Sequence, residues 1–175
     1  MASSSTRELR LIESDELATP SGESMRSTLA GFPTGVAVVA AQIDGRVVGL
    51  SASSLVSISL EPPLVSLSFA RTSTTWPVLR GASQWGISVL SEGQSEVLAR
   101  LRRPARDRFD GIEMTIGDEG DAFVRGSLAK LTVTPRAEID AGDHVLTLLD
   151  VYRLDRTAGL RPLVFFDSAP HHLSY

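Results

Sequence analysis

The chain has 175 residues, of which 42% are hydrophobic, and this suits one globular domain with a real core. Its formal net charge of −4 gives no long-range attraction to nucleic acid or to an anionic membrane, so we expect neither as a partner. The absence of cysteine excludes disulfides and thiolate metal sites. Because no apolar run has the length of a membrane span and no signal-peptide pattern is present, we expect a cytoplasmic protein.

The first part of the chain is polar and serine-rich. Residues 1–22 therefore predict a flexible N-terminal arm, which leaves residues 23–175 as the folded domain. Apolar residues recur at helical spacing from Met25 to Phe32 and predict a short helix, which Pro33 ends.

Two pairs of strands follow. Residues 36–43 and 46–51 read as strands around Asp44-Gly45, a two-residue hairpin signal. Residues 56–60 and 65–69 alternate hydrophobic side chains with serines, so each strand has one hydrophobic face and one hydroxyl face.

Short helices interrupt the later strands. Ser73 is placed to cap a helix through Leu79, and the capping-box spacing of Ser91 and Gln94 predicts a helix that ends before Pro104. A Gly- and Asp-rich loop is expected over residues 106–121. Strands are expected at residues 84–90, 126–138, 144–155 and 163–166. The chain is therefore mainly β, and a closed or nearly closed antiparallel barrel is favoured because closure removes exposed edges.

Several catalytic motifs are missing from the sequence. It contains no dinucleotide or P-loop glycine pattern, no HExxH pair and no GxSxG elbow. Of the three histidines, only His144 is a candidate base, while the adjacent His171 and His172 make a poor metal pair. We therefore expect neither a hydrolase nor a metal site.

The remaining signal is a surface suited to binding. Uncharged hydroxyls on a strand face can hydrogen-bond a flat heteroaromatic ring, and Arg71 to Thr75 next to a helix start can hold a phosphate. A ring and a phosphate together describe a nucleotide-like cofactor. The alternative is that these serines and threonines only satisfy local backbone groups and cap the helix.

Six segments, in this order, resemble one known family. They are FPTGVAVV (32–39), GLSASSLVSISLEPPLVSLSF (49–69), ARTSTTWPVL (70–79), WGISVL (85–90), DRFDGI (107–112) and AGDHVLTLLDV (141–151). The chain resembles, from about residue 25 to about residue 167, the flavin reductase domain, the small component of two-component flavin-dependent monooxygenases.

The resemblance implies an architecture and an activity. The fold would be a split β-barrel of the FMN-binding type, a Greek-key-like antiparallel barrel that works as a homodimer with flavin near the subunit interface. The protein would oxidise NADH or NADPH and release reduced FMN or FAD to a partner monooxygenase. Hydride transfer from nicotinamide to flavin is the cofactors' own chemistry, so the protein would mainly position two rings.

The resemblance also implies roles for individual residues. The isoalloxazine and the ribityl chain would contact Thr34, Ser51, Ala52, Ser53 and Ser54. The ring edge would be lined by Ser68, Phe69 and Ala70, and the phosphate would be held by Arg71, Ser73 and Thr75. His144 would lie on the nicotinamide side as the catalytic candidate; the alternative is a core histidine, since it shares a strand face with Leu146 and Leu148.

Two regions leave further alternatives open. Members of the family commonly end in an aromatic-basic sequence whose arginine and tyrosine help to shape the pyridine-nucleotide site. Here the first aromatic pair, which includes Phe166 as a candidate cofactor contact, is present. The arginine is absent, and His171 or His172 is a candidate replacement. Five arginines are clustered at positions 100, 102, 103, 106 and 108. One interpretation is a solvated helix end, and another is a site for a second phosphate, from FAD or from the pyridine dinucleotide. Nucleic-acid binding is the least favoured interpretation because the net charge of the chain is negative. The rival functions are a flavoprotein that retains its flavin or uses a deazaflavin, and a flavin- or haem-binding barrel without turnover.

Overall fold

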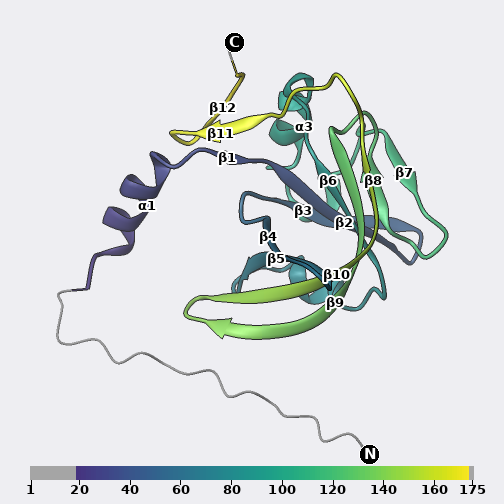
Figure 1. The fold of residues 1–175 in the computed structure, drawn as a ribbon, viewed down its shortest axis with the longest axis horizontal. Helices are drawn as coiled ribbons and strands as arrows, with labels where there is room; N and C mark the ends of the chain where they lie inside the picture. The colour runs from purple at the N-terminus through teal and green to yellow at the C-terminus, as the bar shows by residue number, and fades with distance from the viewer. Residues whose placement is uncertain (1–18, 174–175) are drawn as a thin grey trace, which may run out of the picture.

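A computed structural model describes residues 19–173 of the chain, and nearly half of them lie in antiparallel strands (Figure 1). The helices are α1 (Gly22–Ala30), α2 (Trp76–Leu79) and α3 (Ser95–Arg100), with short 3-10 turns η1 (Glu92–Gln94) and η2 (Ala105–Asp107). The strands are β1 (Thr34–Gly35), β2 (Ala37–Ile43), β3 (Arg46–Ala52), β4 (Val56–Leu60), β5 (Pro63–Ala70), β6 (Trp85–Val89), β7 (Met114–Ile116), β8 (Ala122–Val124), β9 (Ala129–Ala141), β10 (His144–Arg156), β11 (Val164–Phe166) and β12 (Ala169–His171). Residues 1–18 of the expected arm lie outside the described residues.

The main sheet has seven strands in the order β3-β2-β6-β9-β10-β5-β4. The expectation of a closed barrel is wrong for this structure, because the edge strands β3 and β4 form no ladder with each other. The connection between β3 and β4 is held to β5 by Ser54, whose hydroxyl accepts a hydrogen bond from the Ser68 N–H at 3.0 Å and donates to the Ser68 carbonyl at 3.4 Å. The sheet is therefore strongly curved and open (Figure 1).

Two hydrophobic clusters stabilise this sheet. One lies inside the curve and includes the fully buried Trp85, Ile87 and Leu149. The other lies where α3 packs on the sheet, and its buried members include Leu98 and Leu163. Burial of such side chains stabilises a fold by roughly 1.5–3 kcal/mol each, so the central strands have little freedom to move.

The strongest local signals are confirmed. Asp44 and Gly45 adopt positive φ values of 49° and 75°, as a two-residue hairpin turn requires. The N–H of Ser91 donates to Gln94 Oε1 at 3.0 Å, one half of the predicted capping box. The helix expected from Ser73 exists only as the single turn of α2, although the Ser73 hydroxyl does accept a hydrogen bond from the Trp76 N–H at 3.1 Å.

Other expectations need correction. The segment expected to be only a loop contains β7, which pairs with β8. The alternation in β4 does not bury its hydrophobic face, since Val56, Ile58 and Leu60 are all exposed. Helix α1 forms as predicted, yet none of its residues is buried, and it stands away from the sheet (Figure 1).

Two smaller sheets complete the fold. β1, β11 and β12 form a three-stranded sheet beside α1, and β7 and β8 form a two-stranded one. None of the helices in the described part of the chain has the length and hydrophobicity needed to cross a membrane.

Candidate functional site

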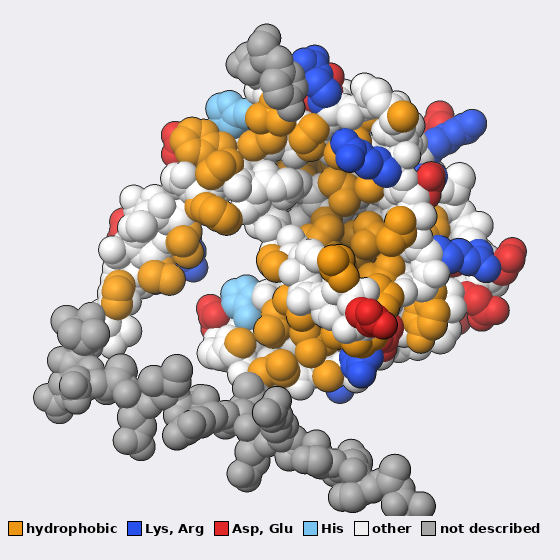
Figure 2. Space-filling view, in the orientation of Figure 1, with side chains coloured by type: hydrophobic (Ala, Val, Ile, Leu, Met, Phe, Trp, Pro, Cys, Tyr) orange, Lys and Arg blue, Asp and Glu red, His pale blue; other side chains and the backbone are white. Residues whose placement is uncertain are grey.

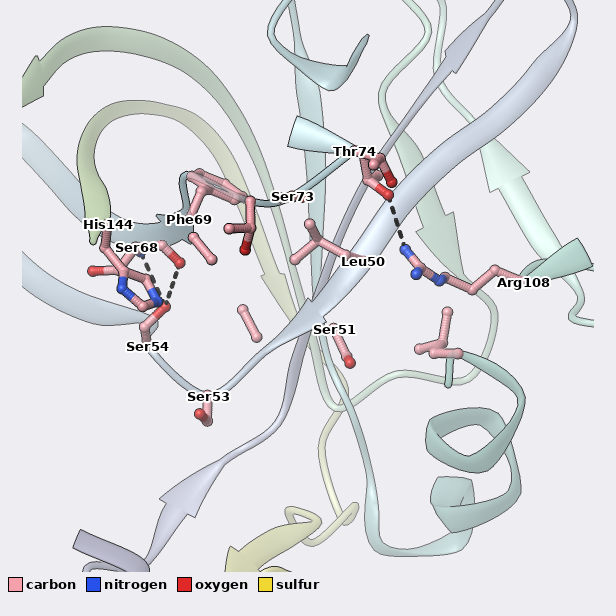
Figure 3. Close-up of a pocket in the computed structure, with 15 residues that line it drawn as sticks. Leu50, Ser51, Ser53, Ser54, Ser68, Phe69, Ser73, Thr74, Arg108 and His144 are labelled. Atoms are coloured by element: carbon pink, nitrogen blue, oxygen red, sulfur yellow. Dashed lines mark hydrogen bonds between the residues drawn. The ribbon is translucent and has the colours of Figure 1, made fainter. Parts of the chain in front are cut away.

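A cavity of about 520 Å³ lies where the end of β3, the end of β5 and the start of β10 meet the loop before α2 (Figure 3). This volume is in the range of small-molecule sites. Its walls are formed by Leu50, Ser51, Ala52, Ser53, Ser54, Ser68, Phe69, Ala70, Thr72, Ser73, Thr74, Thr75, Leu101, Arg108 and His144. The lining contains many hydroxyls but no aspartate or glutamate, so it favours a polar ligand that is neutral or anionic.

One end of the cavity holds His144, beside Ser54 and Ser68 (Figure 3). The buried face of β10 consists of Val145, Thr147 and Leu149, whereas His144 is half-exposed on the other face. The alternative of a core histidine is therefore wrong.

A carboxylate holds the imidazole of His144 at this end. His144 Nδ1 lies 2.7 Å from Asp143 Oδ1. The hydrogen bond with His144, and then the charge of that ring, lower the pKa of Asp143 from its ordinary value. Asp143 thus stays ionised at neutral pH, and because it is exposed it offers the ring a solvent-screened contact rather than a rigid support.

Phe69 forms the rigid apolar part of the wall. It is buried, stacks on Trp76 with ring centroids 5.9 Å apart, and meets Trp85 edge-on at 5.8 Å. Aromatic contacts of this kind fix ring orientation as well as burying area. The cavity at the end of β5 therefore rests on packed core rather than on a mobile side chain.

The opposite end of the cavity is lined by Ser73, Thr74 and Thr75. Thr75 is buried, and its Oγ1 accepts a hydrogen bond from Arg108 Nη1 at 3.1 Å. Because α2 has only four residues, the expected contribution of a helix N-terminus to anion binding is small here. The positive charge at this end comes from Arg108.

Sequence reasoning assigned the charge to another arginine. Arg71 does not line the cavity; its Nη2 pairs with Asp140 and its Nε donates to the Gly142 carbonyl at 3.1 Å. Arg108 is one of five clustered arginines in the sequence and the one that falls within the DRFDGI segment (107–112), but neither pattern predicts that it contacts the 73–75 segment. Its closeness to the 73–75 segment is a tertiary contact, and a motif scan cannot detect it.

The structure brings together most of the other predicted residues. Ten of them line the cavity: Ser51, Ala52, Ser53, Ser54, Ser68, Phe69, Ala70, Ser73, Thr75 and His144. Thr34 lies in a neighbouring apolar hollow, which shares Ser53 with the cavity. Phe166 lies on β11, where it meets His171 edge-on at 5.8 Å, and neither residue lines the cavity. His172 lies near Glu92 instead, with Nδ1 4.0 Å from Oε2.

No set of three histidine, aspartate or glutamate side chains within residues 19–173 is arranged to hold a metal ion. The functional groups that line the cavity are hydroxyls, the imidazole of His144 and the guanidinium of Arg108, with Phe69 beneath them.

Comparison with known proteins decides the family. Residues 29–174 match the model of the flavin reductase like domain. The chain belongs to this family. It is 38% identical over 153 residues to the FMN reductase (NADH) SmoA of Agrobacterium fabrum, a match that covers 86% of this chain and 87% of that protein.

Other members of the flavin reductase family extend the comparison. The chain is 33% identical over 143 residues to the reductase subunit HsaB of a flavin-dependent monooxygenase of Mycobacterium tuberculosis, covering 81% of this chain and 76% of HsaB. Its fold superposes on the NADH:FAD oxidoreductase SgcE6 of Streptomyces globisporus with a TM-score of 0.83 and 26% identity, over 93% of this chain and 100% of the other. That reductase has also been solved with NAD and FAD fragments.

Proposed function

We propose that the protein is an NAD(P)H:flavin oxidoreductase that passes a hydride from NADH or NADPH to FMN or FAD and supplies the reduced flavin to a partner monooxygenase. Family membership and the named reductase relatives support this function. The structural observation that carries it is a cavity with unpaired hydroxyls, an ordered aromatic wall and one guanidinium, and without any carboxylate.

The cavity fits a flavin. The hydroxyls of Ser51, Ser53 and Thr74 make no hydrogen bond to any residue within 19–173, so they are available to a ligand. Ring atoms of a flavin would lie between Phe69 and the Ser51–Ser54 segment. The phosphate would lie at the Ser73–Thr75 end, which places the polar neutral part and the anionic part of the ligand at opposite ends.

A flavin, when bound, supplies the hydride-accepting chemistry. The residues of this chain hold it and exclude water from one side of it. Phe69 is fixed by its two tryptophan neighbours and supports the floor of the cavity from the core beneath it. His144, held by Asp143, lies where the nicotinamide would approach and would orient it. No proton transfer by a strong base is needed, and the chain offers none here.

We also infer that residues 23–175 form one flavin reductase-like domain, built on the open curved sheet, that acts as a homodimer. Hydrophobic side chains gather along α1 (Figure 2). Met25, Leu29 and Phe32 are exposed by 49%, 56% and 67%. The exposed hydrophobic residues of β4 and the apolar hollow around Pro33 and Leu55 continue this surface. A second copy that covered it would remove the exposure, as at other obligate interfaces.

The activity is tested by steady-state oxidation of NADH or NADPH with FMN or FAD, followed at the nicotinamide absorbance band. We expect turnover above the uncatalysed background with at least one of the four pairs. Background rates with every pair would contradict the proposed enzyme and leave the binding-only rival. Gel filtration after mixing with flavin distinguishes a reductase that releases its flavin from a flavoprotein that retains it, because the latter elutes yellow. Light scattering on the same column should report twice the chain mass.

A further inference from the structure

Two arginines flank the Ser73–Thr75 segment, and their surroundings differ. Arg71 is next to this segment in sequence, but its guanidinium is neutralised by Asp140 and further held by the Gly142 carbonyl. Arg108 comes from the loop after α3, more than thirty residues away, and reaches the cavity from the other side (Figure 3). Only the second guanidinium faces the space where a ligand would lie.

Arg108 also lacks a charged partner. Its Nη1 donates to the Gly49 carbonyl at 3.0 Å and to Thr75 Oγ1 at 3.1 Å, and its Nε donates to the Arg103 carbonyl at 3.4 Å. These acceptors are neutral, and no carboxylate of the described chain forms an ion pair with it. Partial burial lowers the pKa of Arg108 from its ordinary value, yet an arginine remains charged at neutral pH.

A half-buried guanidinium without a carboxylate is an unfavourable arrangement unless an anion completes it. Nη2 of Arg108 makes no hydrogen bond to any residue between 19 and 173, so one side of the planar fork is available. The bonds to Gly49 and Thr75 fix the orientation of that fork. Such a fixed guanidinium binds phosphate oxygens strongly and directionally.

We propose that Arg108, and not Arg71, is the guanidinium that binds the phosphate ester of the flavin. The inference rests on the proposed function, because it takes the flavin to be the ligand of this cavity. The hydroxyls of Ser73 and Thr74 flank the same position, so the phosphate would be held between the loop before α2 and the loop after α3. Arg71 instead joins the end of β5 to the β9–β10 turn.

The test compares FMN with riboflavin, which has the same ring but no phosphate. Flavin fluorescence titrations would measure the dissociation constants of both ligands for wild type, Arg108→Ala, Arg108→Lys and Arg71→Ala. Arg106→Ala is the matched control, because that side chain is 83% exposed and pairs only with its neighbour Asp107. Circular dichroism and thermal unfolding establish that each variant is folded.

We expect Arg108→Ala to weaken FMN binding roughly 10- to 100-fold, the usual loss for a charge-assisted hydrogen bond, and to leave riboflavin binding within about twofold. Arg108→Lys should retain part of the preference for FMN, since it keeps the charge but loses the fork. The affinity of wild type for FMN should fall with added salt more steeply than that of Arg108→Ala. Arg71→Ala and Arg106→Ala should match wild type with both ligands.

Three results would overturn the inference. The first is an FMN-selective loss in Arg71→Ala with none in Arg108→Ala. The second is an equal loss of FMN and riboflavin in folded Arg108→Ala, which would assign Arg108 a purely structural role. The third is unchanged FMN affinity with a raised KM for NADH, which would place the pyridine nucleotide at this end. If wild type binds FMN tightly but oxidises no nicotinamide, the proposed enzymatic activity is contradicted. The assignment of Arg108 is then still decided by the FMN and riboflavin titrations.

Discussion

The middle of the main sheet and the cavity at its strand ends both contain serines and threonines, but the two regions use them differently. In the middle, Ser88 is fully buried and its hydroxyl accepts a hydrogen bond from the Val124 N–H at 3.0 Å. Around the cavity, Ser51 and Ser53 have no partner within residues 19–173. Buried polar groups must be satisfied by the protein, whereas groups at a cavity can be left for a ligand. The difference predicts which substitutions affect stability and which affect binding.

The largest expected effect is a loss of stability from a substitution in the hydrophobic core of the main sheet. Leu149→Ala removes a fully buried side chain from the cluster inside the curve of the sheet. We expect the free energy of unfolding, measured with urea, to fall by about 2–5 kcal/mol because of lost burial and the cavity left behind. Flavin affinity per folded molecule should stay the same. A loss below about 1 kcal/mol would mean that this face is not the packed core.

A pair of serine substitutions tests the comparison directly. Ser88→Ala leaves the Val124 N–H without an acceptor in the interior, so we expect a loss of about 1–3 kcal/mol in urea unfolding. Ser53→Ala is the matched control at the cavity and should change stability by no more than about 0.5 kcal/mol. Equal effects of the two changes on stability would remove the distinction between core and cavity serines.

The imidazole end of the cavity should affect turnover rather than flavin affinity. His144→Ala removes the group held by Asp143 where the nicotinamide would approach. We expect kcat/KM for NADH to fall about tenfold, which corresponds to roughly 1.4 kcal/mol of transition-state stabilisation. His171→Ala, outside the cavity, should behave like wild type. Unchanged kinetics for His144→Ala would exclude this histidine from the site.

The smallest expected effect concerns a single hydroxyl. Ser53→Ala should raise the dissociation constant of FMN about threefold to tenfold, since one neutral hydrogen bond contributes about 0.5–1.5 kcal/mol. Ser88→Ala, assayed in folded protein, should bind FMN as wild type does. If Ser53→Ala binds FMN and turns over NADH without change, the hydroxyl does not contact the ligand, although its backbone could still do so.

Local sequence patterns predict the turns, strands and helices that depend mainly on interactions between residues close in sequence. The Asp44-Gly45 turn, the strand at residues 85–89 and helix α1 depend on short-range signals, and all three are present. Alternation misled in β4, because it indicates which side chains share a face but not whether another element covers that face. The sequence does not predict β7, β8 and β12, which are too short to show a period; β11 is equally short and is expected only as part of the apolar run at residues 163–166.

The candidate site likewise contains contacts that local sequence patterns do not predict. Ser51–Ser54 and Ser68–Ala70 were placed together because the resemblance carried over contiguous segments. The sequence predicts Arg71 at the phosphate because it adjoins Thr72–Thr75, yet its side chain pairs with Asp140. Arg108 reaches the cavity only because the loop after α3 folds back onto the middle of β3, at Gly49. A contact between distant segments leaves no local pattern.

The central claim, that this cavity holds the flavin, is tested most directly by blocking it. Ala52 lines the cavity near the end of β3, and Ala52→Trp would fill it; Arg46→Trp, at the opposite end of the same strand, is the control. In fluorescence titrations we expect wild type and Arg46→Trp to saturate with one FMN per chain, and folded Ala52→Trp to show no saturable binding at the same concentrations. Equal FMN binding by folded Ala52→Trp would contradict the account.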